Sequence, residues 1–467
     1  MFSKVLIANR GEIAVRIIHA LHELDITAVA VYSTADKDSQ HVKEADEAVC
    51  IGQPQPAQSY LNMQNIISAA LLTGAQAIHP GYGFLSESSE FAQMCAECHL
   101  VFIGPKAKTI SLMGNKANAR ETMRQHGVPV IPGSTGPVKD AAQALTVANK
   151  VGFPVMLKAV AGGGGKGIRK VKRPEDLPQA FSQAQEEAKL SFGDDSMYLE
   201  KIISPAKHIE VQIIADQAGH VVALPERDCS MQRNQQKVLE ETPCSQINDQ
   251  ERQYLQKITS KAIKAIHYEN VGTIEFLMDP AHHFYFMEMN TRIQVEHSIT
   301  EEVAQIDLVK EQLHIAAGDD LSITQDDVHL HGAAIEARIN AEDPLHHFRP
   351  QAGKIKQMSL PSGLGIRIES GVNSGDQVSP FYDSMIIKII AHADNRSLAI
   401  RRLLDALSEF SITGLKTNRD FLVALLTDSA FQSGNYLTTY IDQQFLPYYI
   451  KQEKEKVGTK EAVTDGN

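Results

Sequence analysis

Short apolar runs alternate with amphipathic segments through the N-terminal part of the chain. The apolar runs predict β-strands at residues 4–9, 26–32, 75–80 and 100–104. After the first run, apolar residues recur with helical spacing at Ile13, Ile17, Ala20, Leu21 and Leu24. An alternation of strand and helix favours a parallel sheet covered by helices, so we expect a Rossmann-like domain over residues 1–129.

A run of glycines interrupts a smaller unit that we expect over residues 130–203. Gly162–Gly165 separates two strand-like segments, residues 154–159 and 167–172. A helix and a further strand complete the predicted unit, at residues 174–190 and 197–202. Consecutive glycines let backbone N–H groups approach a phosphate closely, so we interpret this hairpin as a lid over phosphate. The alternative is a flexible hairpin tip that binds nothing.

From residue 204 onward the pattern changes to alternating strands and hairpins. Residues 208–216 and 219–228 are two such strand-like segments, and they favour an antiparallel or mixed sheet in a C-terminal domain over residues 204–448. The last segment, residues 449–467, is rich in charge and poor in apolar residues, so we expect a disordered tail. The predicted fold class is therefore α/β and α+β in three domains.

Composition narrows the classes of function. The 467 residues carry a net charge of −12, which gives no basic surface for nucleic acid or an anionic membrane. No stretch approaches the ~18 uncharged apolar residues of a membrane span. Five cysteines in a chain of this length argue against a disulfide framework, so we expect a cytoplasmic protein.

Two acidic residues are predicted to face each other in a hairpin. Residues 272–279 and 284–290 are strand-like and are joined by a short turn. Symmetric pairing about that turn places Glu275 opposite Glu288, where like charges are destabilising unless a cation is shared. Carboxylate oxygens suit a hard divalent cation that carries nucleotide phosphates. The alternative is an exposed acidic pair on a solvated face.

Polar residues continue at every second position after this hairpin, at Glu288, Asn290, Arg292, Gln294 and Glu296. If the segment stays extended, all five side chains project from one face. An arginine suits a planar oxyanion such as bicarbonate through its two-pronged guanidinium group. Glu296 is a candidate general base if its neighbours are cationic and its target is close.

Short motifs are distributed along the whole chain: IANRGEIAVRI (7–17), HPGYGFLSE (79–87), GNK (114–116), KAVAGGGGKG (158–167), ERDCSMQR (226–233), QKV (236–238), EFL (275–277), EMNTRIQVEH (288–297), ARINAEDP (337–344) and YDSMI (382–386). Together they resemble biotin carboxylase, a family of the ATP-grasp superfamily, over residues 1–448. The resemblance implies an ATP-grasp fold with a Rossmann-like N-terminal domain, a small lid domain and a C-terminal domain with a mixed or antiparallel sheet.

The resemblance also implies a role for individual residues. ATP contacts are implied for Lys116, Lys158, Gly164, Gly165, Glu200, Lys201, Ile202, Ile203, His208, Gln235, Glu275 and Glu288. Implied ligands of Mg²⁺ or Mn²⁺ are Glu275, Glu288 and Asn290. Bicarbonate is implied to bind Lys237, Arg292 and the backbone of Val295, and the catalytic set is Arg292, Glu296, Lys237 and Arg338. Implied biotin contacts are Tyr82 and Arg338.

The activity implied by the resemblance is ATP- and bicarbonate-dependent carboxylation of biotin through carboxyphosphate. Biotin would be a substrate on a biotin carboxyl carrier protein, with carboxyltransferase subunits and a second copy of the chain as further partners. We expect this to be the first half-reaction of acetyl-CoA carboxylase, in malonyl-CoA and fatty acid biosynthesis. Because the chain has no Met-Lys-Met biotinylation site, we expect those parts on other chains or in a larger carboxylase.

Two residues depart from the family pattern. Gln235 stands where histidine is common, and an amide can donate a hydrogen bond but carries no charge. Ser298 stands where proline is common, which removes one restraint on φ beside Glu296. Two alternatives stay open: another ATP-grasp ligase of the carboxylate–amine or carbamoyl-phosphate type, and a regulatory nucleotide-binding protein that has lost catalysis.

Overall fold

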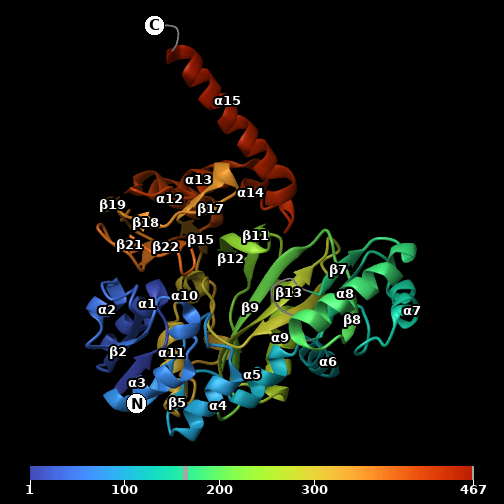
Figure 1. The fold of residues 1–467 in the computed structure, drawn as a ribbon, viewed down its shortest axis with the longest axis horizontal. Coiled ribbons are helices and arrows are strands. Elements are labelled where there is room, and N and C mark those ends of the chain that lie inside the picture. The colour runs from blue at the N-terminus through green and yellow to red at the C-terminus, as the bar shows by residue number, and fades with distance from the viewer. Residues whose placement is uncertain (161–166, 465–467) are drawn as a thin grey trace.

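The computed structural model describes the backbone of residues 1–160 and 167–464, and the side chains of those residues as far as residue 455. The predictions for Gly164 and Gly165 therefore lie outside the described residues. Figure 1 shows the N-terminal part, the lid unit and the C-terminal part arranged around a large central sheet. Within the described ranges, no helix is long and apolar enough to cross a membrane.

The N-terminal part contains a parallel sheet with the strand order β3-β2-β1-β4-β5, as the alternating pattern predicted. Its strands are β1 (Lys4–Ile7), β2 (Thr27–Ser33), β3 (Glu47–Gly52), β4 (Ala77–His79) and β5 (Val101–Phe102). Its helices are α1 (Gly11–Glu23), α2 (Gln40–Glu44), η1 (Pro56–Gln58), α3 (Met63–Thr73) and α4 (Ser89–Glu97). The apolar side of α1 packs on the sheet because Ile13, Ile17 and Leu21 lie along one face of the helix.

The lid unit is a three-stranded antiparallel sheet with two α-helices and one short 3-10 helix. Its strands are β6 (Val155–Ala159), β7 (Ile168–Val171) and β8 (Met197–Lys201), with β6 in the middle. Its helices are α7 (Ala141–Val151), η2 (Pro174–Asp176) and α8 (Leu177–Phe192), and α5 (Ala107–Gly114) and α6 (Lys116–Gln125) lead into it. The predicted hairpin around the glycine run is confirmed by the pairing of β6 with β7.

The central sheet has the strand order β14-β13-β9-β11-β12-β15-β22-β20, and β10 pairs with β9. Every pairing in it is antiparallel, which confirms the change of pattern after residue 204. The strands are β9 (Lys207–Ala215), β10 (Val221–Ala223), β11 (Arg227–Arg233), β12 (Gln236–Thr242), β13 (Asn270–Met278), β14 (Phe284–Asn290), β15 (Ala333–Asn340), β20 (Ile366–Ser370) and β22 (Met385–Ala393).

Helices and short strands complete the C-terminal part. The helices are α9 (Asp249–Ala265), α10 (His297–Ala304), α11 (Leu308–Ala316), η3 (Gln325–Asp327), η4 (Pro344–His346), α12 (Arg396–Glu409), α13 (Arg419–Thr427), α14 (Ser429–Ser433) and η5 (Ile441–Phe445). The short strands are β16 (Glu342–Asp343), β17 (Arg349–Pro350), β18 (Gly353–Lys354), β19 (Gln357–Ser359), β21 (Gln377–Val378) and β23 (Ser411–Thr413). Helices α12 and α13 bury Leu403, Phe421 and Leu425 in the core beside β15 and β22.

Two expectations from the sequence were wrong. The chain forms a helix, α15 (Leu446–Thr464), where we expected a disordered tail from residue 449, and Figure 1 shows this helix extending away from the rest of the molecule. Lysine, glutamate and glutamine favour a helix even where they cannot build a core. Strand β14 ends at Asn290, so residues 291–296 form bends and turns rather than continuing the strand.

Candidate active site

The acidic pair predicted from the hairpin is present. Glu275 and Glu288 are direct cross-strand partners in β13 and β14. Asn290 Nδ2 and Gln294 Nε2 donate to Glu275 Oε1 at 2.5 and 2.8 Å, and Lys116 Nζ lies 3.0 Å from Glu288 Oε2. The Glu288 carboxylate raises the pKa of Lys116. Carboxylate and amide oxygens are the ligands that Mg²⁺ prefers, so Glu275, Glu288 and Asn290 are of types that fit that ion. The Asn290 amide turns its Nδ2 to Glu275 and its Oδ1 to Arg292, so it would have to rotate to offer its oxygen to an ion beside Glu275.

A buried histidine links this pair to a further carboxylate. His208 Nε2 lies 2.9 Å from Glu275 Oε2 and 3.1 Å from Glu210 Oε1. Burial lowers the pKa of His208, but the two carboxylates outweigh burial and raise it to about 10. His208 is therefore a cation at neutral pH and shares the carboxylates with Lys237, whose Nζ contacts Glu210 and lies 3.7 Å from Glu275.

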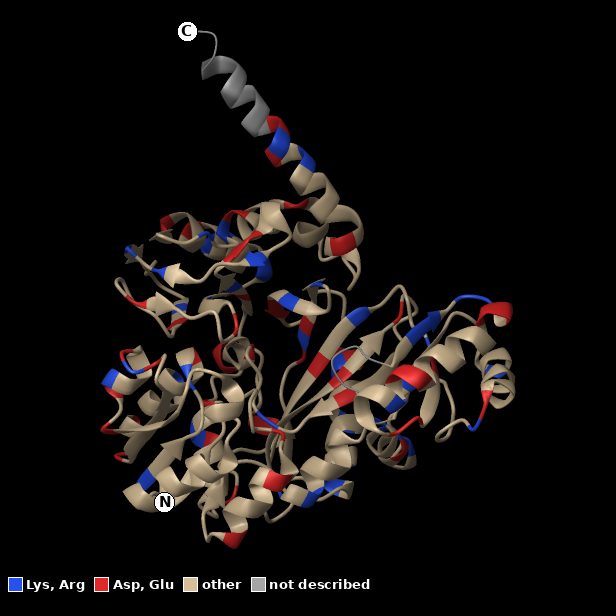
Figure 2. Cartoon of the chain, viewed as in Figure 1, with Lys and Arg blue, Asp and Glu red and all other residues tan. Residues whose placement is uncertain are grey.

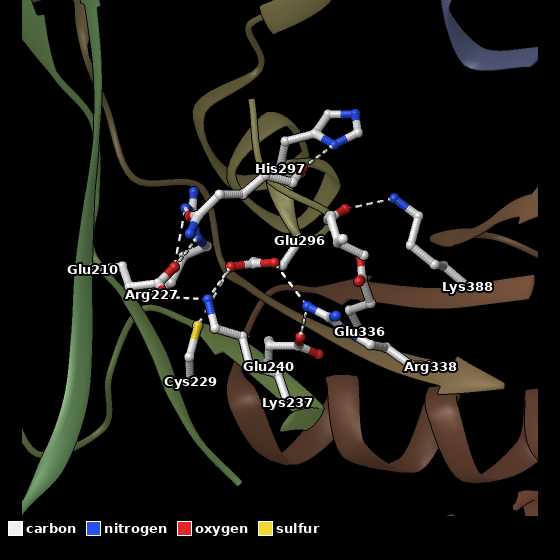
Figure 3. Close-up of polar contacts among 12 residues, drawn as sticks. Glu210, Arg227, Cys229, Lys237, Glu240, Glu296, His297, Glu336, Arg338 and Lys388 are labelled. Atoms are coloured by element: carbon white, nitrogen blue, oxygen red, sulfur yellow. Dashed lines mark hydrogen bonds and ion pairs between the residues drawn. The ribbon is translucent and has the colours of Figure 1, made fainter. Parts of the chain in front are cut away.

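Glu296 lies between two cations. Lys237 Nζ donates to its Oε1 at 2.6 Å and Arg338 Nη2 donates to its Oε2 at 2.8 Å, as Figure 3 shows. Burial raises the pKa of Glu296, yet Lys237 and Arg338 together bring it below its usual range. The carboxylate is thus ionised and able to accept a proton. Arg338 also contacts Glu240, whose pKa burial raises to about 8.

The lid unit faces the acidic pair with a lysine of its own. Lys158 Nζ, on β6, pairs with Glu200 Oε2 on β8 at 2.5 Å. Burial raises the pKa of Glu288, and the charges of Lys116, His208 and Lys158 outweigh burial and lower that pKa. The N–H groups of Lys201 and Ile202 donate to Pro132 and Pro154 at 2.7 and 3.0 Å. Ile203 follows them, half-buried, beyond the end of β8.

Three other predicted residues occupy different surroundings. Arg292 Nη2 donates to Asn290 Oδ1 at 2.9 Å, and its Nε donates to Glu87 Oε2 at 3.1 Å. The Tyr82 hydroxyl is buried and has no hydrogen-bond partner among the described residues. Gln235 lies exposed in the turn between β11 and β12, with φ of 65°.

Sequence reasoning missed several charged residues of this cluster. Glu210 and Arg227 are fully buried, and Arg227 contacts Glu210, Gln212, Thr300 and Gln294. A glutamate within the apolar segment HIEVQII was the available signal, because a buried charge requires a partner. Figure 2 shows charged positions of both signs on the strands in the middle of the molecule.

The structure combines a small lid of antiparallel strands, which carries Lys158, with a larger antiparallel sheet, which carries the paired carboxylates. This combination defines the chain as an ATP-grasp protein. The sequence models of three domains match it: the biotin carboxylase N-terminal domain at residues 1–110, the ATP-binding domain of the carbamoyl-phosphate synthase L chain at 115–324, and the biotin carboxylase C-terminal domain at 336–443.

Known proteins agree with these matches. The chain is 50% identical to the biotin carboxylase of Nostoc sp. over 442 residues, which cover 95% of this chain and 99% of that one. It is similar to the structure of the biotin carboxylase domain dimer of Hydrogenobacter thermophilus 2-oxoglutarate carboxylase with MgADP, ADP and bicarbonate, with a TM-score of 0.91, 45% identity and coverage of 96% and 99%. A Campylobacter jejuni biotin carboxylase–β-γ-ATP complex gives a TM-score of 0.91 at 44% identity, with coverage of 95% and 99%.

The chain belongs to the biotin carboxylase family, whose members are ATP-dependent ligases. Its relatives include components of other carboxylases. The 2-oxoglutarate carboxylase small subunit of H. thermophilus and a pyruvate carboxylase subunit of Methanothermobacter thermautotrophicus are each 46% identical over 443 residues, or 95% of this chain and 94% and 90% of theirs. The matches to both biotin carboxylase terminal domains favour this family over a carbamoyl-phosphate or carboxylate–amine ligase.

Proposed function

We propose that this chain uses ATP and bicarbonate to carboxylate biotin held on a biotin carboxyl carrier protein. The observation that carries the proposal is the ionised Glu296 between Lys237 and Arg338, next to the Glu275–Glu288 pair. One carboxylate is thereby available as a base, and two cations are available for anionic reactants. A regulatory protein without catalysis has no need of such an arrangement.

Phosphate binding is assigned to Lys116 and Lys158. Each lysine pairs with a carboxylate in this structure, Glu288 and Glu200 respectively, and ATP phosphates would compete for the same charges. We assign a divalent cation, Mg²⁺ or Mn²⁺, to Glu275, Glu288 and Asn290. When bound, such an ion offsets the negative charge of the phosphates.

The remaining nucleotide contacts are assigned to residues at the end of β8 and in the lid. The adenine contacts are Glu200, Lys201, Ile202 and Ile203, with His208 as a further nucleotide contact and Gly164 and Gly165 as lid residues. Gln235 is a further assigned nucleotide contact, and its side chain is exposed in the hairpin turn between β11 and β12.

Bicarbonate is assigned to Lys237, Arg292 and the backbone of Val295. Glu296 accepts the bicarbonate proton, and the resulting oxyanion attacks the γ-phosphate of ATP to give carboxyphosphate and ADP. Carboxyphosphate then breaks down to CO₂ and phosphate, and that phosphate takes the N1′ proton of biotin. Arg338 stabilises the biotin enolate, which captures CO₂, and Tyr82 contributes to the same pocket.

The final acceptor, the partners and the domain limits are further parts of the proposal. We assign the chain to an acetyl-CoA carboxylase that supplies malonyl-CoA for fatty acid synthesis, with carboxyltransferase subunits on other chains. Support comes from 50% identity to a protein described simply as biotin carboxylase. The dimer of the H. thermophilus relative supports a homodimer. We place the domain limits at residues 1–129, 130–203 and 204–448.

Two measurements test the proposal. Phosphate release from MgATP should require bicarbonate, should rise on addition of free biotin, and should yield carboxybiotin. An ATP turnover rate that depends on neither bicarbonate nor biotin would refute the proposed biotin carboxylation. Reconstitution with a carrier protein and with acetyl-CoA, pyruvate or 2-oxoglutarate carboxyltransferases then identifies the acceptor. Carboxyl transfer to pyruvate or 2-oxoglutarate, without transfer to acetyl-CoA, would refute the assignment to acetyl-CoA carboxylase.

A further inference from the structure

Lys388 is a fully buried lysine for which the proposed reaction has no role. It lies on β22, and the exposed fraction of its side chain is 0%. Its Nζ lies 2.6 Å from the Val295 carbonyl oxygen, 2.6 Å from Glu369 Oε2 and 3.3 Å from Ser298 Oγ. Lys388 thus donates hydrogen bonds to the Val295 carbonyl and the Ser298 hydroxyl and forms an ion pair with Glu369. Two of these three partners belong to the segment around Glu296.

Lys388 and Arg338 are direct partners across neighbouring strands. The register of β15 with β22 pairs Arg338 with Lys388, and the register of β20 with β22 pairs Glu369 with Lys388. Cross-strand neighbours have Cβ atoms about 4.5–5.5 Å apart, and two cations at that distance repel unless anionic groups lie between them. Arg338 binds the Glu296 carboxylate, and Lys388 binds the carbonyl of the preceding residue. The two cations therefore bind neighbouring residues of one loop, Lys388 at the Val295 carbonyl and Arg338 at the Glu296 carboxylate.

The loop has no strand partner of its own at this point. Strand β14 ends at Asn290 and α10 begins at His297, so no sheet hydrogen bonds fix residues 291–296. The Val295 carbonyl and the Glu296 N–H belong to one planar peptide group. A hydrogen bond to that carbonyl therefore also sets the direction in which the chain enters Glu296.

Ser298 connects the same loop to the strand that carries Arg338. Its hydroxyl donates to Glu336 Oε2 at 2.8 Å and accepts from Lys388. Glu336 is fully buried, and its Oε1 has no hydrogen-bond partner in the part of the chain that the structure describes. Glu336 and Arg338 are two residues apart on β15 and so share a face of the sheet. In the view of Figure 3, Lys388 and Glu336 lie on the side of Glu296 away from Lys237.

We propose that Lys388 and Ser298 are positioning residues for bicarbonate: they fix the Val295–Glu296 peptide so that the Glu296 carboxylate stays between Lys237 and Arg338. Neither residue touches a reactant. The inference rests on the proposed function, because it assigns the two residues to the bicarbonate step of that reaction. It requires that their loss affects bicarbonate and leaves MgATP binding unchanged.

The test compares KM for bicarbonate with KM for MgATP in phosphate release by the full chain. Ser298→Ala should raise KM for bicarbonate about tenfold, the effect of losing one hydrogen bond to a charged group, while KM for MgATP stays within about twofold. The double variant Lys388→Met/Glu369→Gln removes both members of the buried ion pair and should raise KM for bicarbonate further. Lys416→Met is a surface control: Lys416 is 62% exposed and pairs with Asp343 at 2.6 Å in the same C-terminal part, so its replacement should leave both KM values unchanged.

Thermal unfolding of each variant shows whether it folds, and Ser298→Ala keeps the test decisive if the double variant does not. Folded variants with wild-type KM for bicarbonate, or with equal increases in both KM values, would overturn the positioning role. Failure of the proposed function looks different, because the wild-type chain itself would then show no bicarbonate-dependent phosphate release.

Discussion

Replacing Arg338 with glutamine separates the early and late halves of the proposed reaction. Arg338 donates to Glu296 at 2.8 Å and also contacts Glu240, so its removal affects the proposed base as well as the biotin enolate. Lys237 remains at 2.6 Å from Glu296 and keeps that carboxylate paired. We therefore expect a smaller loss of rate in the bicarbonate step than in the biotin step.

The magnitudes follow from the contacts. Loss of one hydrogen bond to a charged group costs about 1.5–3 kcal/mol, which limits the decrease in biotin-independent ATP cleavage to roughly 10- to 150-fold. Loss of a donor to a developing oxyanion costs a further ~2.7–4 kcal/mol, or roughly 10²- to 10³-fold, and only carboxybiotin formation includes that step. The ratio of carboxybiotin to phosphate should therefore fall by about two to three orders of magnitude.

The assay measures phosphate release and carboxybiotin in parallel. Glu296→Gln should suppress both products, since Glu296 acts before the two paths divide. Arg396→Gln is a matched control, because Arg396 is about as buried as Arg338 and pairs with Glu241 at 2.6 Å. Equal decreases in both products for Arg338→Gln would refute the late role and leave Arg338 a residue that binds ATP or bicarbonate or stabilises the fold.

Three further predictions concern the metal site, the lid and a buried histidine. Glu275→Gln or Glu288→Gln should weaken ATP cleavage and its dependence on Mg²⁺ together, and wild-type metal titrations in both variants would contradict a shared site. Deleting two of Gly162–Gly165 should reduce nucleotide-dependent turnover. The Tm should stay close to that of wild type, because the run lies in the hairpin between β6 and β7. Unchanged turnover would show that the glycine run has no role in the reaction. Protonated His208 should stabilise the fold fully below its ordinary pKa of 6.5, and this stabilisation should be lost as pH rises towards 10. The Tm difference between wild type and His208→Gln should therefore narrow between pH 6.5 and 10. A Tm difference that stays constant over this range would contradict the protonated state of His208.

The sequence determined those features that depend on neighbouring residues. The strand and helix alternation of the N-terminal part follows from local periodicity. Symmetric pairing about the short turn predicted Glu275 opposite Glu288, and the two are partners. The register beside the turn, Met278 with Phe284, would by itself place Glu275 opposite Met287, and a shift between Glu275 and Phe276 brings Glu288 into place. The motifs were equally local, and they carried the family and the proposed roles of Lys237, Glu296 and Arg338.

Only the tertiary structure decided what surrounds Glu296. Lys237, Arg338 and Lys388 come from β12, β15 and β22, and no local pattern specifies which strands become neighbours in a sheet. The end of β14 at Asn290 and the buried Glu210 depend on the same long-range packing. A charge is stable in the interior only beside its partner. Here Lys237 is 27 residues from Glu210, Arg338 is 42 residues from Glu296, and Lys388 is 93 residues from Val295, so these groups meet only once the chain has folded.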